Sequence, residues 1–269
     1  MSRSGERSHT LGYLNVIGYV AFVVLNLLAN IVMYGGVTTA QVSDYYANLF
    51  APAGLTFSIW GVIYVLLGVF TIYQARGYKP ELTAKISYWF LLSCIANVVW
   101  LFLWQYFQIP LTLIVMIALL LCLLFIYVRL GAYTGFTKEN LIMRVPFSVY
   151  LGWITVATIG NVTTLLVYLD LSLRNPAVSA FGIAQDLWAI IIIAIAVILC
   201  LVVLFTRKDI AYSLVFIWAL LGILIKRMSD YVDVAATAAI GIAAILIVIV
   251  VVWFRYWRSG NKSAKSKSK

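Results

Sequence analysis

Aromatic and carboxamide side chains recur together along three apolar stretches of the sequence. The residues are Trp60 and Tyr64 in one stretch; Asn97, Trp100 and Trp104 in the next; and Trp153, Ala157, Thr158 and Asn161 in the third. Most of these spacings are three, four, seven or eight residues, which places side chains on one face of a helix. Flat apolar walls with a few polar anchors suit a planar hydrophobic ligand, so these residues are the candidate binding site.

The amides must face protein rather than hydrocarbon, because lipid tails offer no hydrogen-bond partner. A further stretch carries Asn15, Asn26 and Asn30 on one side of a helical wheel. Two interpretations stay open for every such residue. The amides line a ligand cavity, or they join neighbouring helices by hydrogen bonds while the tryptophans fill volume.

Other chemistry finds little support in the sequence. The single histidine is His9, and the three cysteines (Cys94, Cys122 and Cys200) lie in separate apolar stretches. No cluster with metal-ligand spacing, no pair of neighbouring catalytic carboxylates and no glycine-rich phosphate loop is present. We therefore expect no metal, no obligatory cofactor and no hydrolytic or phosphoryl-transfer activity.

Composition places the chain in a membrane. Hydrophobic residues make up 64% of the 269 residues and charged residues 10%, with a mean hydropathy of +1.03. Soluble domains have roughly 45–50% and 25%, respectively. A polytopic bundle in the lipid bilayer is predicted, and a disordered chain, a disulfide-stapled secreted module and an ordinary nucleic-acid binder are excluded.

Apolar runs of about 20 residues, the length that crosses a bilayer, predict an all-α fold with eight transmembrane helices. The runs cover residues 11–34, 55–75, 86–107, 110–130, 145–169, 185–205, 210–225 and 234–254. The seventh run is the weakest, because at 1.5 Å per residue it reaches only about 24 Å. No run has an ionisable residue near its middle, which argues against a pump or an ion-coupled transporter.

Basic residues predict the orientation. With the N-terminus in the cytoplasm and eight crossings, 16 of the 19 basic residues lie on the cytoplasmic side, and only Arg174, Lys226 and Arg227 lie opposite. This asymmetry predicts a multi-pass protein of the cytoplasmic membrane with both termini inside. The basic tail, residues 256–269, is predicted to be disordered and to anchor this topology.

Three motifs, in order along the chain, resemble the TspO/translocator protein family of tryptophan-rich sensory proteins. Residues 51–64 resemble its Pro-Pro-Gly-Trp-Val-Phe segment, with one proline missing. Residues 96–100, Ala-Asn-Val-Val-Trp, resemble its Leu-Asn-x-x-Trp motif, and Pro110 opens the following span. Residues 146–161 keep the tryptophan, the Ala-Thr pair and the asparagine of its fifth span.

The resemblance implies a five-helix core at residues 1–170, followed by three further helices at 171–255 that have no counterpart in the five-helix family. It also implies a pocket within the bundle that binds a porphyrin, a haem-like tetrapyrrole or a sterol. The positions that match the family motifs are Trp60, Asn97, Trp100, Trp153, Ala157, Thr158 and Asn161.

Several functions remain open. The first is a sensor or receptor that binds such a ligand in an aromatic pocket. The alternatives are a facilitator or exporter of small uncharged metabolites, a membrane scaffold whose last three helices dock a partner, and a porphyrin-degrading activity. An enzyme is the least favoured of these, a homodimer is left open, and no nucleic-acid partner is expected.

Overall fold

The computed structural model describes residues 3–78, 80–86, 88–131, 137–169 and 183–267, and its fold is all-α. Within these described residues, eight long helices follow one another: α1 (Arg3–Ile31), α3 (Ile59–Ala75), α5 (Trp89–Gln105), α6 (Ile109–Leu130), α8 (Val145–Tyr168), α9 (Gln185–Arg207), α10 (Ile210–Arg227) and α11 (Val232–Lys267). The short elements are α2 (Thr39–Tyr45), the 3₁₀ helix η1 (Gly54–Ser58), α4 (Pro80–Ile86) and α7 (Lys138–Met143). The eight predicted spans are confirmed as helices.

Seven helical segments of the described chain are long and apolar enough to cross a membrane, and the eighth long helix, α5, is a shorter apolar helix. The sequence points to residues 210–225 as the weakest span, but α10 has 18 residues because it continues through Lys226 and Arg227. The shortest long helices are instead α3 and α5, with 17 residues each. The 3₁₀ helix η1 leads directly into α3, whereas α5 has no such extension. Helix α5 ends at Gln105, just before Phe107 takes a positive φ of 58°.

The last helix differs from expectation at its end. Residues 256–267, which the sequence predicts to be disordered, continue α11 as far as Lys267. No proline interrupts the chain between residues 232 and 267, and extending an existing helix adds one hydrogen bond for each residue that is fixed. Residues 256–267 therefore extend the helix beyond its apolar part, and residues 268–269 of the predicted tail lie outside the described residues.

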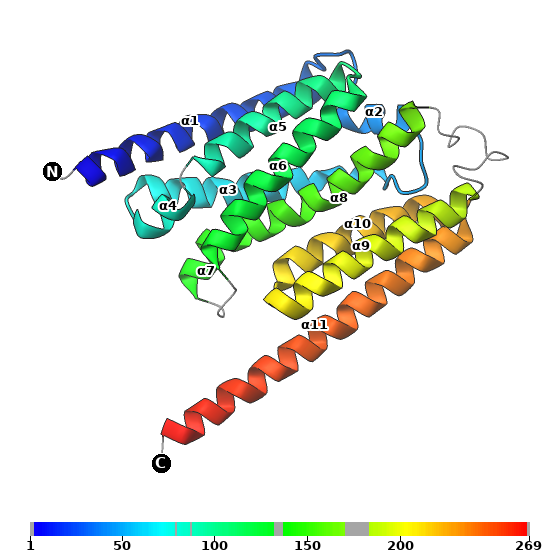
Figure 1. Ribbon diagram of the computed structural model, residues 1–269. Coiled ribbons are helices and arrows are strands. Elements are labelled where there is room, and N and C mark those ends of the chain that lie inside the picture. Colours follow the sequence, from blue (N-terminus) through cyan, green and yellow to red (C-terminus); the bar gives the residue numbers. More distant parts are fainter. Residues whose placement is uncertain (1–2, 79, 87, 132–136, 170–182, 268–269) are drawn as a thin grey trace.

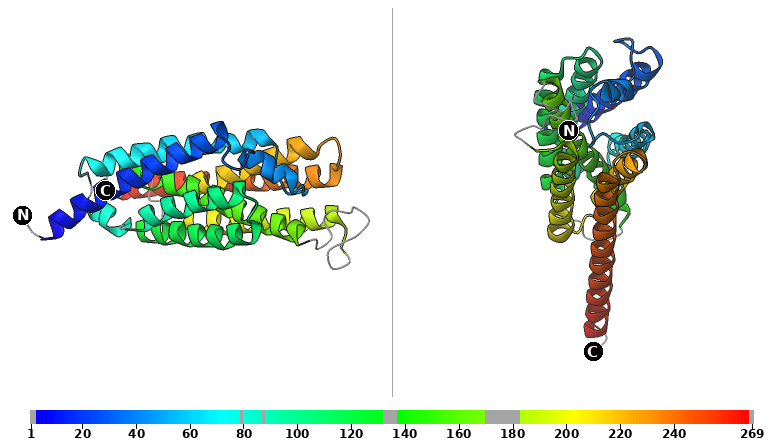
Figure 2. Two further views of the ribbon diagram at one scale, coloured as in Figure 1. Left: turned by 90° about the horizontal axis from the view of Figure 1, so that it is seen from above. Right: turned by 90° about the vertical axis from the view of Figure 1, so that its right-hand side faces the viewer.

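The first five long helices close into a ring. Around this ring α1 packs against α3 and α5, α6 lies between α5 and α8, and α8 returns to α3. The remaining helices, α9, α10 and α11, pack against one another and join the ring chiefly through α10 on α8 (Figure 1). The start of α1 and the end of α11 lie at the same end of the bundle, opposite α2, as an even number of crossings requires (Figures 1 and 2).

Close packing and a buried carboxylate attach α10 to the ring. A Cβ added at Gly152 of α8 would lie 3.0 Å from the carbonyl oxygen of Tyr212, so glycine permits the two helices to approach. Asp209 caps α10 through the Tyr212 amide at 3.0 Å. The same carboxylate accepts hydrogen bonds from Ser148 of α8 at 2.6 Å and from Tyr127 of α6 at 2.9 Å. One buried side chain thus connects three helices.

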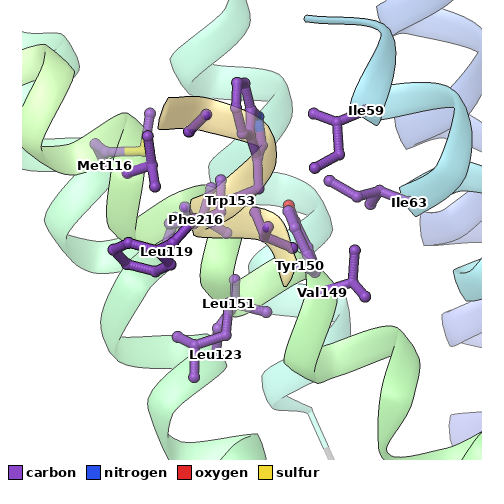
Figure 3. Close-up of a cluster of buried hydrophobic side chains, with 14 of the residues drawn as sticks. Ile59, Ile63, Met116, Leu119, Leu123, Val149, Tyr150, Leu151, Trp153 and Phe216 are labelled. Atoms are coloured by element: carbon purple, nitrogen blue, oxygen red, sulfur yellow. The ribbon is translucent and has the colours of Figure 1, made fainter. Parts of the chain in front are cut away.

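The interior of the ring is apolar and aromatic. Figure 3 shows Tyr150 and Trp153 of α8 with Ile59 and Ile63 of α3 on one side and Met116 of α6 on the other. These side chains are almost completely buried. A rigid core of this kind holds the α8 tryptophan in one position at the edge of the pocket described next.

Candidate ligand-binding pocket

A small cavity of about 60 Å³ lies inside the ring, toward the end of the bundle where α2 is found. Helices α3, α5 and α8 form one part of its lining, and α2 with the chain that follows it forms the rest. The helical lining consists of Trp60, Trp100, Trp104, Trp153, Val156, Ala157, Gly160, Asn161 and Thr164. The other lining residues are Thr39, Ser43, Asn48, Phe50, Ala51, Pro52 and Phe57.

Four tryptophans from three helices converge on this cavity. Trp60 and Trp153 meet edge to face, with ring centroids 6.3 Å apart and an interplanar angle of 85°. Trp100 and Trp104 are stacked at 5.4 Å, and Phe57 meets Trp153 edge to face at 6.0 Å. These geometries are favourable for aromatic pairs and fix the rings relative to one another.

Hydrogen bonds hold two of the indoles in place. The Trp100 Nε1–H donates to Asn161 Oδ1 at 3.2 Å, and the Trp104 Nε1–H donates to the Thr39 carbonyl oxygen at 3.0 Å. The Asn161 amide in turn donates to the Ala157 carbonyl oxygen at 3.0 Å. Asn161 therefore orients a tryptophan of the pocket and also lines it.

Two polar atoms of the lining residues are buried and lack a hydrogen-bond partner among the described residues: Trp153 Nε1, a donor, and Asn48 Oδ1, an acceptor. A buried polar group without a partner costs roughly 1–3 kcal/mol. A ligand with complementary polar groups would remove that cost. The described residues of the lining include no Lys, Arg, Asp or Glu, so the cavity is suited to an uncharged part of a ligand.

Six of the nine residues predicted from the sequence line the cavity: Trp60, Trp100, Trp104, Trp153, Ala157 and Asn161. The three helical faces do meet, as the spacing of these residues predicts. Their role in binding a ligand stays a prediction.

The other three predicted residues lie outside the lining, and each has a structural contact. Tyr64 is one turn from Trp60 and stacks on it at 5.9 Å. Asn97 is completely buried and accepts a hydrogen bond from Asn26 Nδ2 at 2.9 Å, so here the amide joins α5 to α1. Thr158 donates to the Ile154 carbonyl oxygen of its own helix at 2.6 Å.

The sequence patterns do not predict that residues of α2 and of the chain between α2 and α3 line the cavity. One signal for α2 is present in the sequence, namely the Thr-x-x-Gln pattern of a capping box. The Thr38 side chain accepts from the Gln41 amide at 3.3 Å, and Gln41 Oε1 accepts from the Thr38 amide at 2.7 Å. This box starts α2, which brings Thr39 and Ser43 to the cavity.

The architecture and the pocket define a class: a multi-pass helical membrane protein with a tryptophan-lined cavity inside a five-helix ring. A family model described as TSPO-like protein matches residues 12–252, and the chain belongs to this family. The matched region extends beyond the motifs in residues 51–161 and includes α9, α10 and most of α11. No curated protein and no solved structure matches the chain significantly.

Proposed function

We propose that the protein binds a hydrophobic, largely planar small molecule, such as a tetrapyrrole haem precursor or a sterol-like compound, in the cavity between α3, α5 and α8. The observation that carries the proposal is the convergence of Trp60, Trp100, Trp104 and Trp153 on one cavity. Such rings present large apolar faces at little cost in conformational entropy. The binding event would serve a sensory or a transport role.

The polar atoms in the lining support the same proposal. Trp153 Nε1 can donate to a ligand and Asn48 Oδ1 can accept from one, and neither has a partner within the described protein. A few placed polar groups in an apolar pocket give a ligand its orientation. A charged group on the ligand would have to point out of the cavity, because the lining supplies no countercharge.

The volume sets a condition on binding. The cavity of about 60 Å³ is well below the roughly 300–1,000 Å³ of small-molecule pockets. Part of the lining must therefore move before a tetrapyrrole or a sterol can enter. The tryptophans on α3, α5 and α8 belong to the packed ring, so the part that moves is the chain around residues 44–57.

A titration with two named probes tests this function. Protoporphyrin IX and cholesterol are each added to the purified protein in lipid nanodiscs, and tryptophan emission is followed. The discriminating variant is Gly160→Leu, because a Cβ at Gly160 meets no atom within 4 Å and Gly160 lines the cavity. The leucine therefore fills the space that the ligand requires.

The matched control is Gly61→Leu, at an exposed position of α3 where a Cβ also meets nothing within 4 Å. We expect saturable quenching by at least one probe in the wild type and in Gly61→Leu, and a loss of affinity of tenfold or more in Gly160→Leu. Quenching that is equal in both variants would place the probe outside the cavity and refute the proposal. Flux of the bound probe across liposomes then separates transport from sensing.

A further inference from the structure

We propose that α10 controls entry to the pocket: Lys226 and Arg227 hold residues 44–57, the wall segment, closed over the cavity, and release of these contacts admits the ligand. The inference rests on the proposed function for the presence of a ligand, whereas the contacts that hold the wall segment do not depend on it. Five lining residues come from the wall segment, namely Asn48, Phe50, Ala51, Pro52 and Phe57. It therefore forms a substantial part of the enclosure.

Arg227 fastens the middle of the wall segment through its backbone. Its guanidinium donates to the carbonyl oxygen of Asn48 at 2.8 Å and to that of Leu49 at 3.3 Å. A third bond goes to Asp230 at 3.0 Å, which supplies a countercharge. The residue is 8% exposed. A planar, multiply bonded guanidinium in a buried place fixes geometry more strongly than a single contact does.

Lys226 contacts the same segment on both sides of the residues that Arg227 binds. Its Nζ lies 2.7 Å from an oxygen of the Asp44 carboxylate and donates to the Pro52 carbonyl oxygen at 3.4 Å. Both side chains of the ion pair are partly exposed, at 27% for Lys226 and 60% for Asp44. Water can reach this pair, so it can break and re-form more easily than the Arg227 contacts.

Two contacts deeper in α10 hold the end of the wall segment. The Trp218 Nε1–H donates to the Thr56 carbonyl oxygen at 2.8 Å, and the Ala53 amide donates to the Gly222 carbonyl oxygen at 3.1 Å. Four residues on α10, one on each successive turn or at its end, thus contact the wall. Helix α10 therefore supports the wall of the pocket from outside, and α9 and α11 pack against α10.

The described wall segment has few backbone hydrogen bonds within itself. Between α2 and η1 the Ala51 amide donates to the Asn48 carbonyl oxygen at 3.2 Å, which is the one internal backbone–backbone bond among the described residues there. The Asn48 Nδ2 also donates to the Tyr46 carbonyl oxygen at 3.1 Å. The helical walls, by contrast, carry a backbone bond at nearly every residue. Local opening favours the part with the fewest internal bonds, so the wall segment opens when α10 releases it.

The charge distribution gives an independent argument. Lys226 and Arg227 are two of the three basic residues that the predicted topology places on the non-cytoplasmic side, against the usual retention of Lys and Arg inside. Each has an acidic partner, Asp44 and Asp230 respectively. Retention of basic residues in the cytoplasm does not account for Lys226 and Arg227 at the end of α10. Their acidic partners and the carbonyl oxygens of the wall segment do.

Stopped-flow mixing with protoporphyrin IX tests the inference through rates. In Lys226→Met the association and dissociation rate constants should both rise by the same factor, roughly 1.5- to 5-fold, the range given by an exposed ion pair. The dissociation constant should stay within about twofold, because the wall recloses over the ligand. The charge exchange Asp44→Lys/Lys226→Asp should restore slower rates than either single variant, and Lys138→Met, at an exposed position of α7, should leave them unchanged.

A loss of affinity without faster association in Lys226→Met would overturn the inference, because it would show a static structural role. A second measurement needs no ligand. Hydrogen–deuterium exchange should accelerate in peptides of residues 44–57 in both Lys226→Met and Asp44→Asn, while peptides of α8 keep their wild-type protection. Unchanged exchange in residues 44–57, or an equal rise in α8, overturns the inference. Failure of both protoporphyrin IX and cholesterol to bind the wild type would overturn the proposed function alone, and the exchange measurement would still test the contacts.

Discussion

A single methyl group at Gly222 should separate α10 from the pocket wall. In Gly222→Ala the new Cβ would occupy the place of Thr56 Oγ1 and would lie 2.9 Å from Pro52 Cβ, about 0.5 Å inside the 3.4 Å at which ordinary contact begins. Overpacking of this kind costs about 1–3 kcal/mol. If the wall segment instead moves away from α10, the hydrogen bonds from Trp218 to Thr56 and from Ala53 to Gly222 weaken. Each of these bonds contributes about 1 kcal/mol to stability.

Thermal unfolding in detergent measures this cost. For a loss of about 2–4 kcal/mol and a slope near 2–4 °C per kcal/mol, the melting temperature of Gly222→Ala should fall by at least about 4 °C. Hydrogen exchange in residues 44–57 should rise in the same variant.

The control for this prediction is Gly61→Ala on α3, where a Cβ meets nothing within 4 Å. It should melt at or above the wild-type temperature, because alanine favours a helix over glycine. If Gly222→Ala melts as the control does and keeps wild-type exchange in residues 44–57, then α10 does not support the wall and the reasoning fails.

Two further predictions concern the polar contacts inside the bundle. Asp209→Ala should destabilise the protein by about 2–4 kcal/mol in thermal unfolding, because the α10 cap is lost and the hydroxyls of Ser148 and Tyr127 lose their shared acceptor. Asp209→Asn should cost less, and equal melting of the Ala variant and the wild type would contradict the assignment. A double-mutant cycle of Asn26→Val and Asn97→Val should give a coupling of about 0.6 kcal/mol, typical for such bonds in membranes, whereas additive effects would show that their hydrogen bond contributes nothing.

The eight helices could be predicted from the sequence because span length and hydropathy are local properties. The convergence of Trp60, Trp100 and Trp153 could be predicted from helical spacing together with the cost of exposing Asn161 to lipid. The same reasoning selected Asn97 for the pocket, yet the structure pairs it with Asn26. Spacing along one helix defines a face but does not say which neighbour, helix or cavity, that face will meet.

The contacts between α10 and the wall segment could not be predicted from local patterns. Asp44 and Lys226 are 182 positions apart, and neither side chain belongs to an apolar repeat. The sequence motifs that resemble the family end at residue 161, although the family model matches as far as residue 252. In the structure α10, which lies in this C-terminal region, contacts the wall segment from outside. These contacts depend on how the three-helix unit of α9–α11 packs on the ring (Figure 1), which local sequence patterns do not define.

The central claim, that the tryptophan-lined cavity between α3, α5 and α8 is the binding site, is tested most directly by an experimental structure determined with protoporphyrin IX or cholesterol bound. We predict ligand density enclosed by Trp60, Trp100 and Trp153, with the wall segment displaced outward relative to the closed cavity described here. Density confined to the lipid-facing surface, above a cavity that keeps its present lining, would contradict the account.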